Sequence, residues 1–164
     1  MKALRLLLMP AVLVSGLASA GEAPSSGFTA PLRPTLQSLN CGSRLRAFSD
    51  GTTMYCATTA SPGVARPNGP AVTLHQNGTK ASEGQYIDGN REGVWSYFDA
   101  AGNRTKQIEF KADHYHGKFM QYTEGRKILE HTYVKGLRQG PQLTFDATGK
   151  STAIEYRDDR PASK

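Results

Sequence analysis

One feature limits the fold more than any other: from Gly69 onward the chain repeats itself about every 23 residues. The glycines that close successive units stand 24, 23 and 24 residues apart: Gly78, Gly102, Gly125 and Gly149. Aromatic residues form a second column, with steps of 24, 23 and 23: Tyr86, Phe110, Tyr133 and Tyr156. A unit this short cannot bury its own apolar face, so each unit must pack against its neighbours and the fold must grow in one dimension.

Each unit reads as two strands joined by tight turns. In the clearest unit, residues 88–93 form a turn, residues 94–98 an aromatic-rich strand and residues 99–103 a second turn. Turn residues recur every 10 to 13 positions, and the runs between them are rich in Tyr, Phe, Ile and Thr, which favour strands. No segment shows the apolar spacing of an amphipathic helix. The sequence therefore predicts an all-β fold, a meandering antiparallel sheet of β-hairpin repeats that forms a single-layer ribbon.

The glycines of the repeat are predicted to mark turns, because glycine adopts a positive φ without steric cost. The predicted turn glycines are Gly78, Gly89, Gly93, Gly102, Gly117, Gly125, Gly136, Gly140 and Gly149. The aromatic columns are expected to form cross-strand pairs, each contributing roughly 0.2 to 1 kcal/mol beyond an alanine pair. Gly69 and Leu74 fit the pattern one unit earlier, which indicates an atypical first repeat that starts near Cys56.

The first 20 residues have the organisation of a secretory signal peptide. Lys2 and Arg5 precede an apolar run over residues 6–14, and the segment ends on the small residues 18–20. We predict cleavage after Ala20 and export to the periplasm or the cell exterior. The apolar run is too short to span a bilayer, and no other segment is long enough. The residue directly after the cleavage site is not a cysteine, so we do not expect a lipid anchor there.

Two cysteines follow the signal peptide, Cys41 and Cys56. In an exported chain an even cysteine count favours a disulfide, which at this spacing would stabilise the fold by about 3 kcal/mol. A redox pair or a zinc site is less favoured, because a redox pair usually has closer cysteines and zinc needs further ligands nearby.

We predict an unstructured linker over residues 21–40, a disulfide-clipped cap over 41–68, and the repeat domain over 69–160.

The charge balance does not favour a nucleic-acid partner. The chain has 20 Lys and Arg and 14 Asp and Glu, and the signal peptide holds two of the basic residues, which leaves 18 minus 14, or +4. The signs alternate along the chain with no basic block, as on a solvated sheet face.

The sequence carries no recognisable catalytic set. The acidic residues are spread over turns and strands, no Ser lies in a G-x-S-x-G elbow, and no Gly-rich phosphate loop precedes a helix. Asp113, His114 and His116 are candidate metal ligands, but three closely spaced ligands at a hairpin tip favour a solvated turn. The other strand histidines, His75 and His131, are expected at surface or edge positions. We therefore predict a protein that is not an enzyme and has no cofactor or metal.

Two interpretations of the aromatic and basic residues stay open. The aromatics can pack the sheet while the lysines cover its edges and keep it soluble. Alternatively, the face with Trp95, Tyr97 and Phe119 can bind a partner, because Trp and Tyr often anchor interfaces. A basic fringe would lie beside that face: Lys106, Lys111, Lys118, Arg126, Lys127, Lys135 and Arg138.

The repeat resembles the MORN-variant repeat of bacterial proteins. The pattern is Tyr86-x-x-Gly89-x-x-x-Gly93-x-Trp95-x-x-Phe98-x-x-x-Gly102, repeated over residues 110–125 and 133–149. With Cys41, Cys56 and the Gly69-Pro70 pair ahead of the repeats, residues 41–160 are similar to exported repeat proteins of the myxobacterial kind. The chain departs from the pattern at four positions: Asp113 and Asp159 replace the first turn glycine, Gln142 replaces the residue at the Trp95 position, and Pro141 follows Gly140. Asp tolerates turn conformations, so we expect those two hairpins to form.

Proteins of this family are described as scaffolds, as lipid binders or as antitoxin partners of toxins. The sequence and the resemblance together favour a non-enzymatic exported module that binds a protein partner or serves as a structural scaffold. Two alternatives stay open: binding to an anionic lipid or envelope polysaccharide surface, and an antitoxin-like or immunity-like role beside a toxin.

Overall fold

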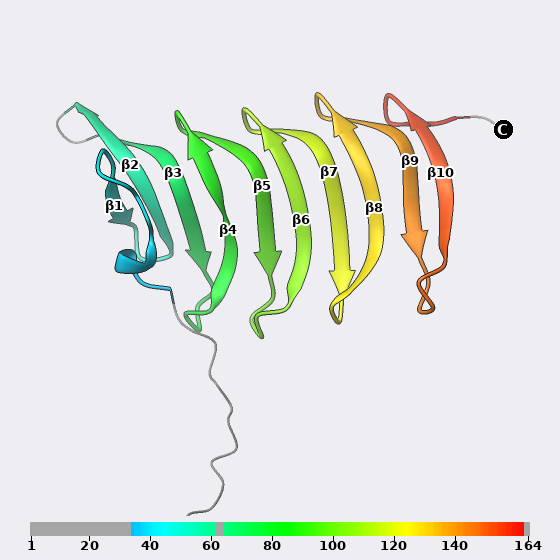
Figure 1. The fold of residues 1–164 in the computed structure, drawn as a ribbon, viewed down its shortest axis with the longest axis horizontal. Helices are drawn as coiled ribbons and strands as arrows, with labels where there is room; N and C mark the ends of the chain where they lie inside the picture. The colour runs from blue at the N-terminus through cyan, green and yellow to red at the C-terminus, as the bar shows by residue number, and fades with distance from the viewer. Residues whose placement is uncertain (1–33, 62–63, 163–164) are drawn as a thin grey trace, which may run out of the picture.

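The computed structural model describes residues 34–61 and 64–162, and these form one open antiparallel sheet (Figure 1). Its eleven strands follow one another in chain order, so every neighbour in the sheet is also a neighbour in the sequence. The elements are η1 (Leu36–Ser38), β1 (Arg46–Ser49), β2 (Thr53–Ser61), β3 (Val64–Leu74), β4 (Lys80–Ile87), β5 (Asn90–Phe98), β6 (Arg104–Lys111), β7 (His114–Thr123), β8 (Arg126–Val134), β9 (Leu137–Phe145), β10 (Ser151–Arg157) and β11 (Arg160–Pro161). The predicted all-β meander is confirmed. The predicted signal peptide and residues 21–33 lie outside the described residues.

The hairpin turns at one end of the ribbon, the upper end in Figure 1, are two-residue turns. They consist of residues 88–89, 112–113, 135–136 and 158–159, and φ is 48° to 51° at the first residue and 63° to 85° at the second. Positive φ at both central residues defines a type I′ turn, whose twist matches that of the flanking strands. Asp113 and Asp159 adopt this conformation where other repeats have glycine, as expected.

These turns are also bonded to one another along the ribbon. The backbone N–H of Gly89 donates to the carbonyl of Pro67, and that of Gly136 donates to the carbonyl of Tyr115. Asp113 and Asp159 make the same bond to residues one repeat earlier, Arg91 and Arg138. Each turn is therefore fixed to the preceding hairpin, as expected for a one-dimensional stack.

At the opposite end of the ribbon an aspartate organises two of the turns. Asp99 Oδ1 accepts the backbone N–H groups of Ala101 and Asn103 at 3.0 and 2.8 Å. Two repeats later, Asp146 Oδ1 accepts the corresponding groups of Thr148 and Lys150 at 2.8 and 3.0 Å. A short acceptor side chain at the start of a turn satisfies donors that the sheet leaves unpaired.

Bulges bend the strands between the two sets of turns. In each repeat three residues of one strand face a single residue of the preceding strand, at 68–70, 93–95, 116–118 and 140–142. Each bulge contains a glycine with φ between +66° and +103°. The sequence predicted turns at Gly93, Gly117 and Gly140, whereas the structure places these glycines inside β5, β7 and β9. A bulge bends its strand and increases its twist, which accounts for the curved strands in Figure 1.

The two faces of the curved sheet differ in burial. We call the face that carries the core the buried face; its fully packed members are Ala71, Trp95, Ile108, Phe110 and Phe119, with tyrosines and Leu129 around them. Side chains alternate along each strand, so the residues between them lie on the other face, which we call the open face. Within the described residues each strand packs chiefly on the strands beside it. The burial of one face therefore follows from curvature and from neighbouring side chains.

The predicted disulfide between Cys41 and Cys56 is present, with the two Cα atoms 5.4 Å apart. Cys56 is fully buried and lies opposite the bulge at residues 68–70, which fits the first repeat expected near this residue. The cap expected over residues 41–68 is not separate from the sheet, because it contributes β1 and β2, and β3 runs across the expected boundary at residue 69. Part of the segment predicted as a linker also has structure, namely the single 3-10 turn of η1.

Candidate functional site

The aromatic residues expected to form a binding face lie on the buried face. Trp95 is 4% exposed and Phe119 is 9% exposed, and Tyr97 is half-buried beside them. The Trp95 Nε1–H donates to the carbonyl of Gln85 at 3.2 Å, so its polar atom is used within the sheet. The prediction had these rings on one face, which is correct, but the curvature of the sheet leaves little of Trp95 or Phe119 for a partner to contact.

These rings form a continuous row across the ribbon instead. Ring centroids are 5.1 Å apart between Tyr86 and Trp95, between Phe110 and Tyr115, and between Tyr115 and Tyr133. Most pairs in the row meet edge to face, the arrangement that the ring quadrupole favours. The aromatic columns of the sequence thus connect one repeat to the next.

Most cations of the expected basic fringe are also in use. Lys106 lies 4.6 Å from the centre of the Tyr97 ring, and Arg138 lies 4.2 Å from that of Tyr156. One set recurs with the repeat: Lys80 over Phe98, Arg104 over Tyr122 and Lys127 over Phe145, at 4.9, 5.8 and 4.8 Å. Lys118 and Lys127 both bind the carboxylate of Glu130, and Arg126 binds Glu124. Lys111 and Lys135 are the exceptions in the fringe, since neither pairs with a carboxylate or ring among the described residues.

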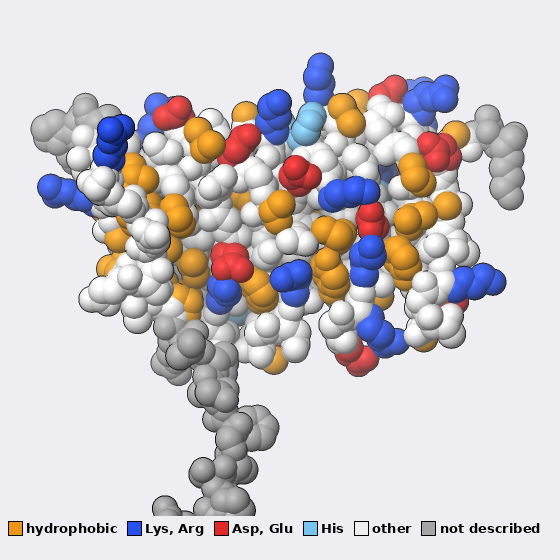
Figure 2. Space-filling model, viewed as in Figure 1, with side chains coloured by type: hydrophobic (Ala, Val, Ile, Leu, Met, Phe, Trp, Pro, Cys, Tyr) orange, Lys and Arg blue, Asp and Glu red, His pale blue; other side chains and the backbone are white. Residues whose placement is uncertain are grey.

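These two lysines line a pocket with two histidines. The cavity has a volume of about 340 Å³ and is bounded by Lys111, His114, His116 and Lys135. Lys111 and His114 are cross-strand partners beside the β6–β7 turn, and Lys135 comes from the β8–β9 turn of the next repeat. Lys, Arg and His side chains stand together over these two tips along the upper edge in Figure 2. Four groups that can carry positive charge therefore surround one cavity at the hairpin tips.

One hydrogen bond orients His116 in this pocket. The backbone N–H of Lys135 donates to His116 Nδ1 at 3.4 Å. A neutral imidazole that accepts at Nδ1 carries its proton on Nε2, so the outer nitrogen is a donor. The same position of the preceding repeat is Glu92, which accepts the N–H of Ala112 at 2.9 Å. His116 thus replaces a carboxylate at a structurally repeated position.

The residues of the considered metal site do not converge. The Asp113 carboxylate binds Arg91 at 2.7 Å, and this ion pair lowers the pKa of Asp113. Tyr115 belongs to the aromatic row, so His114 and His116, on either side of it, share the open face. Among the described residues, no three His, Cys, Asp or Glu side chains are grouped as metal ligands.

His131 was expected at a surface or edge position, and that prediction is wrong. The side chain is 6% exposed, stacks on Phe119 at 4.6 Å, and lies edge-on to Tyr133 at 4.8 Å. Both ring nitrogens are buried without a hydrogen-bond partner in the described part of the chain. Burial lowers the pKa of His131, and Arg138 lowers it further while Asp159 opposes this. The register could have located it, because His131 follows Ile108, a fully buried residue, by one repeat length of 23.

Comparison with models of known protein families finds no match to this chain, and comparison with curated proteins finds none either. The resemblance to MORN-variant repeats therefore stays a prediction. In the described part of the chain, no helix has the length and apolar character needed to cross a membrane.

Proposed function

We propose that this chain is a non-enzymatic, exported repeat protein that acts as a binding scaffold for a protein partner. In this proposal the ribbon is the support, and the partner contacts the open face beside the type I′ turns. The resemblance to MORN-variant repeats and the signal-peptide pattern are consistent with such a role outside the cytoplasm.

One observation carries the proposal: the residues beside each type I′ turn at the upper end in Figure 1 differ from repeat to repeat, while the contacts that stack the hairpins recur. We call these turn-flanking positions the rim; its cross-strand pairs are Ile87 with Asn90, Lys111 with His114, Val134 with Leu137, and Arg157 with Arg160. The residues that precede the first three pairs, Tyr86, Phe110 and Tyr133, belong to the aromatic row, so these pairs lie on the open face. A constant frame with variable exposed positions is how repeat proteins form specific binding surfaces.

The apolar part of the rim supports a protein partner. Val134 and Leu137 are each 42% exposed and Ile87 is 49% exposed, although each lies beside a turn where a polar side chain could stand. Exposed aliphatic side chains rimmed by polar groups are typical of protein-interaction surfaces.

Site-specific photo-crosslinking tests the proposal. A photo-reactive amino acid is placed at residue 134 or 137 of the full chain in cells that export it, and the products are resolved by mass. We expect one discrete crosslinked species from the rim. The control position is Ile128, which is on β8 near its other end and is 37% exposed. Equal products from the rim and the control, or none from the rim, would contradict the proposal.

A second candidate function is binding to an anionic surface, either a lipid or an envelope polysaccharide. The observation that favours it is the pair Lys111 and Lys135, which face a common cavity without a carboxylate partner in the described chain. Co-sedimentation with phosphatidylglycerol vesicles tests it. Binding should weaken as salt rises from about 0.01 M to about 0.15 M, because the screening length falls from about 30 Å to about 8 Å. Absence of vesicle binding at the lowest salt removes the lipid form of this candidate.

A further inference from the structure

We propose that the cavity between the β6–β7 and β8–β9 tips is a specific site for a phosphate or sulfate group. We call it the basic pocket, lined by Lys111, His114, His116 and Lys135. The inference rests on the second candidate function and deepens it, since it assigns anion recognition to one site rather than to the summed charge of the ribbon.

The donors of the basic pocket suit an oxyanion. Each lysine ammonium supplies three N–H donors, and His116 Nε2 supplies another because Nδ1 is engaged by the backbone of Lys135. His114 stands across the strand pair from Lys111, so the two bases flank the same opening. Tetrahedral oxyanions bind where several cationic donors converge from different directions, and here the donors come from two adjacent hairpins.

Two carboxylates close in the chain or on the same face do not neutralise the basic pocket. Asp113, next to His114 in the chain, is paired with Arg91. Glu109, on the open face of β6, accepts the backbone N–H of Lys118 at 3.1 Å. Neither residue lines the cavity, so an arriving anion meets cations that have no carboxylate partner in the described residues.

The neighbouring repeats provide an internal comparison. One repeat earlier, between the β4–β5 and β6–β7 tips, the positions equivalent to the four pocket residues hold Ile87, Asn90, Glu92 and Ala112. Those between the β8–β9 and β10–β11 tips hold Val134, Leu137, Gln139 and Asp158, with Gln139 bonded to Asp158. The backbone is the same in each case, yet only the central set is basic at all four positions. The positive charge is therefore a property of these side chains and not a consequence of the repeat.

The first experiment measures anion binding in solution. The full chain, labelled with 15N, is titrated with inorganic phosphate and separately with sulfate, and amide shifts are followed by NMR. We expect saturable shifts centred on residues 111–116 and 135. The double substitution Lys111→Gln, Lys135→Gln should weaken binding by about tenfold or more, because two charge-assisted contacts are lost. His116→Gln introduces the residue found at the equivalent position of the next repeat, Gln139. This variant should keep the fold while its phosphate binding is weakened.

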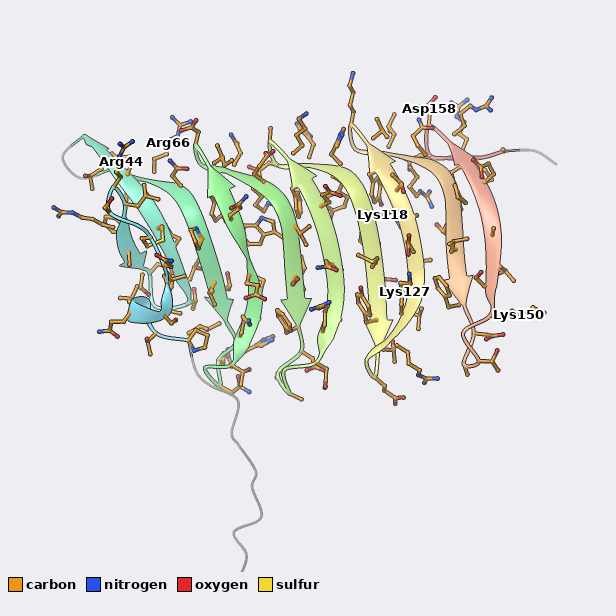
Figure 3. All side chains as sticks on the ribbon, in the orientation of Figure 1. Arg44, Arg66, Lys118, Lys127, Lys150 and Asp158 are labelled. Carbon is orange, nitrogen blue, oxygen red and sulfur yellow. A yellow bond between two sulfur atoms is a disulfide. The ribbon has the colours of Figure 1, made fainter. Side chains whose placement is uncertain are left out.

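A matched control removes the same charge elsewhere. The double substitution Arg44→Gln, Lys150→Gln also lowers the net charge by two, at positions near opposite ends of the ribbon (Figure 3). This variant should bind phosphate within about twofold of the unchanged chain. Equal weakening in both double variants, or no saturable binding by the unchanged chain, would overturn the proposal.

Vesicles then distinguish the source of the anion. If the pocket variant loses both inorganic phosphate and phosphatidylglycerol vesicles, a lipid phosphate is the ligand. If the pocket variant loses inorganic phosphate but binds vesicles normally, the pocket is supported and its ligand is a soluble or glycan-borne group. The same conclusion follows if the unchanged chain binds phosphate and no vesicles. In the last case binding to a lipid surface fails while the site does not. Vesicle binding without any phosphate or sulfate site refutes the pocket and leaves the surface function.

Discussion

Trp95 lies directly over Gly84 on the preceding strand: a Cβ atom at residue 84 would stand 2.3 Å from the indole ring. No real Cβ contact is that short, so position 84 requires glycine under the only tryptophan of the chain. The glycine has no positive φ, and its role is therefore steric.

The first prediction concerns this contact. Gly84→Ala should lower the free energy of unfolding by about 1 to 3 kcal/mol, as overpacking does in well-packed cores. The measurement is chemical denaturation followed by tryptophan fluorescence and circular dichroism. In a Trp95→Leu background the added methyl group has more room, so the same substitution should cost less. An equal cost in both backgrounds would show that the two residues are not coupled.

The second prediction concerns the buried imidazole of His131. Its pKa is lowered in the folded chain from the ordinary value of 6.5, so between the two values the unfolded chain binds more protons. The folding stability that depends on a neutral His131 is complete above about pH 6.5 and is lost as pH falls below that value. His131→Phe should remove this part of the acid sensitivity and raise stability by about 1 to 3 kcal/mol, because two unsatisfied nitrogens disappear.

Denaturation curves between pH 5 and pH 8 test this prediction. The matched control is His114→Phe, at an exposed position, which should leave the acid sensitivity of the chain in place. A His131→Phe variant with the same slope of stability against pH as the unchanged chain would show that His131 is not the sensitive group.

The third prediction concerns the disulfide. Cys41→Ala with Cys56→Ala should lower the free energy of unfolding by about 2 to 4 kcal/mol. Because each hairpin packs chiefly on its neighbours, the loss of hydrogen-exchange protection should be confined to β1, β2 and β3. A uniform loss over all strands would mean that the ribbon unfolds as one cooperative unit. The loosened β1 edge should also increase self-association, measurable by light scattering.

The fourth prediction concerns a turn. Ala112 has φ of 48°, which Asn adopts more readily than Ala. Ala112→Asn should raise the free energy of unfolding by about 0.5 to 1 kcal/mol, measured by thermal and chemical denaturation. Ala147→Asn is the control, because Ala147 lies in a turn without a positive φ and should change stability little. A gain of equal size at both positions would rule out backbone conformation as the cause.

The period and the strand class could be predicted because each depends on spacing along the chain, and the disulfide because an exported chain with two cysteines favours one. Gly89 and Gly136 lie at predicted turns because of that spacing. Gly93 could not be distinguished from a turn glycine, because a bulge and a turn make the same local demand for positive φ. The burial of Trp95 agrees with the interpretation in which the aromatics pack the sheet. The sequence alone did not choose between packing and a binding face, because the curvature that covers the ring depends on strand register.

The candidate site was predictable in part. His114 and His116 are two positions apart on a strand, so the sequence predicts that they lie on one face. Lys135 belongs to the next repeat, and it joins them only through the pairing of one turn with the hairpin before it. Asp113 is next to these histidines in the chain, but the type I′ turn directs its carboxylate to Arg91 on the other face.

The bonds that fix each turn to the preceding hairpin also set a distance. Neighbouring strands stand about 4.8 Å apart, and a repeat adds two strands, so equivalent rim positions follow at intervals of about 10 Å. This interval is determined by backbone hydrogen bonds, and substitution of rim side chains leaves it unchanged. The rim positions are therefore regularly spaced along the ribbon. A ligand whose own groups recur at about the same interval would contact successive hairpins in the same way. Inserting or deleting one 23-residue unit would shift every later rim position by one whole interval without altering the chemistry of any of them.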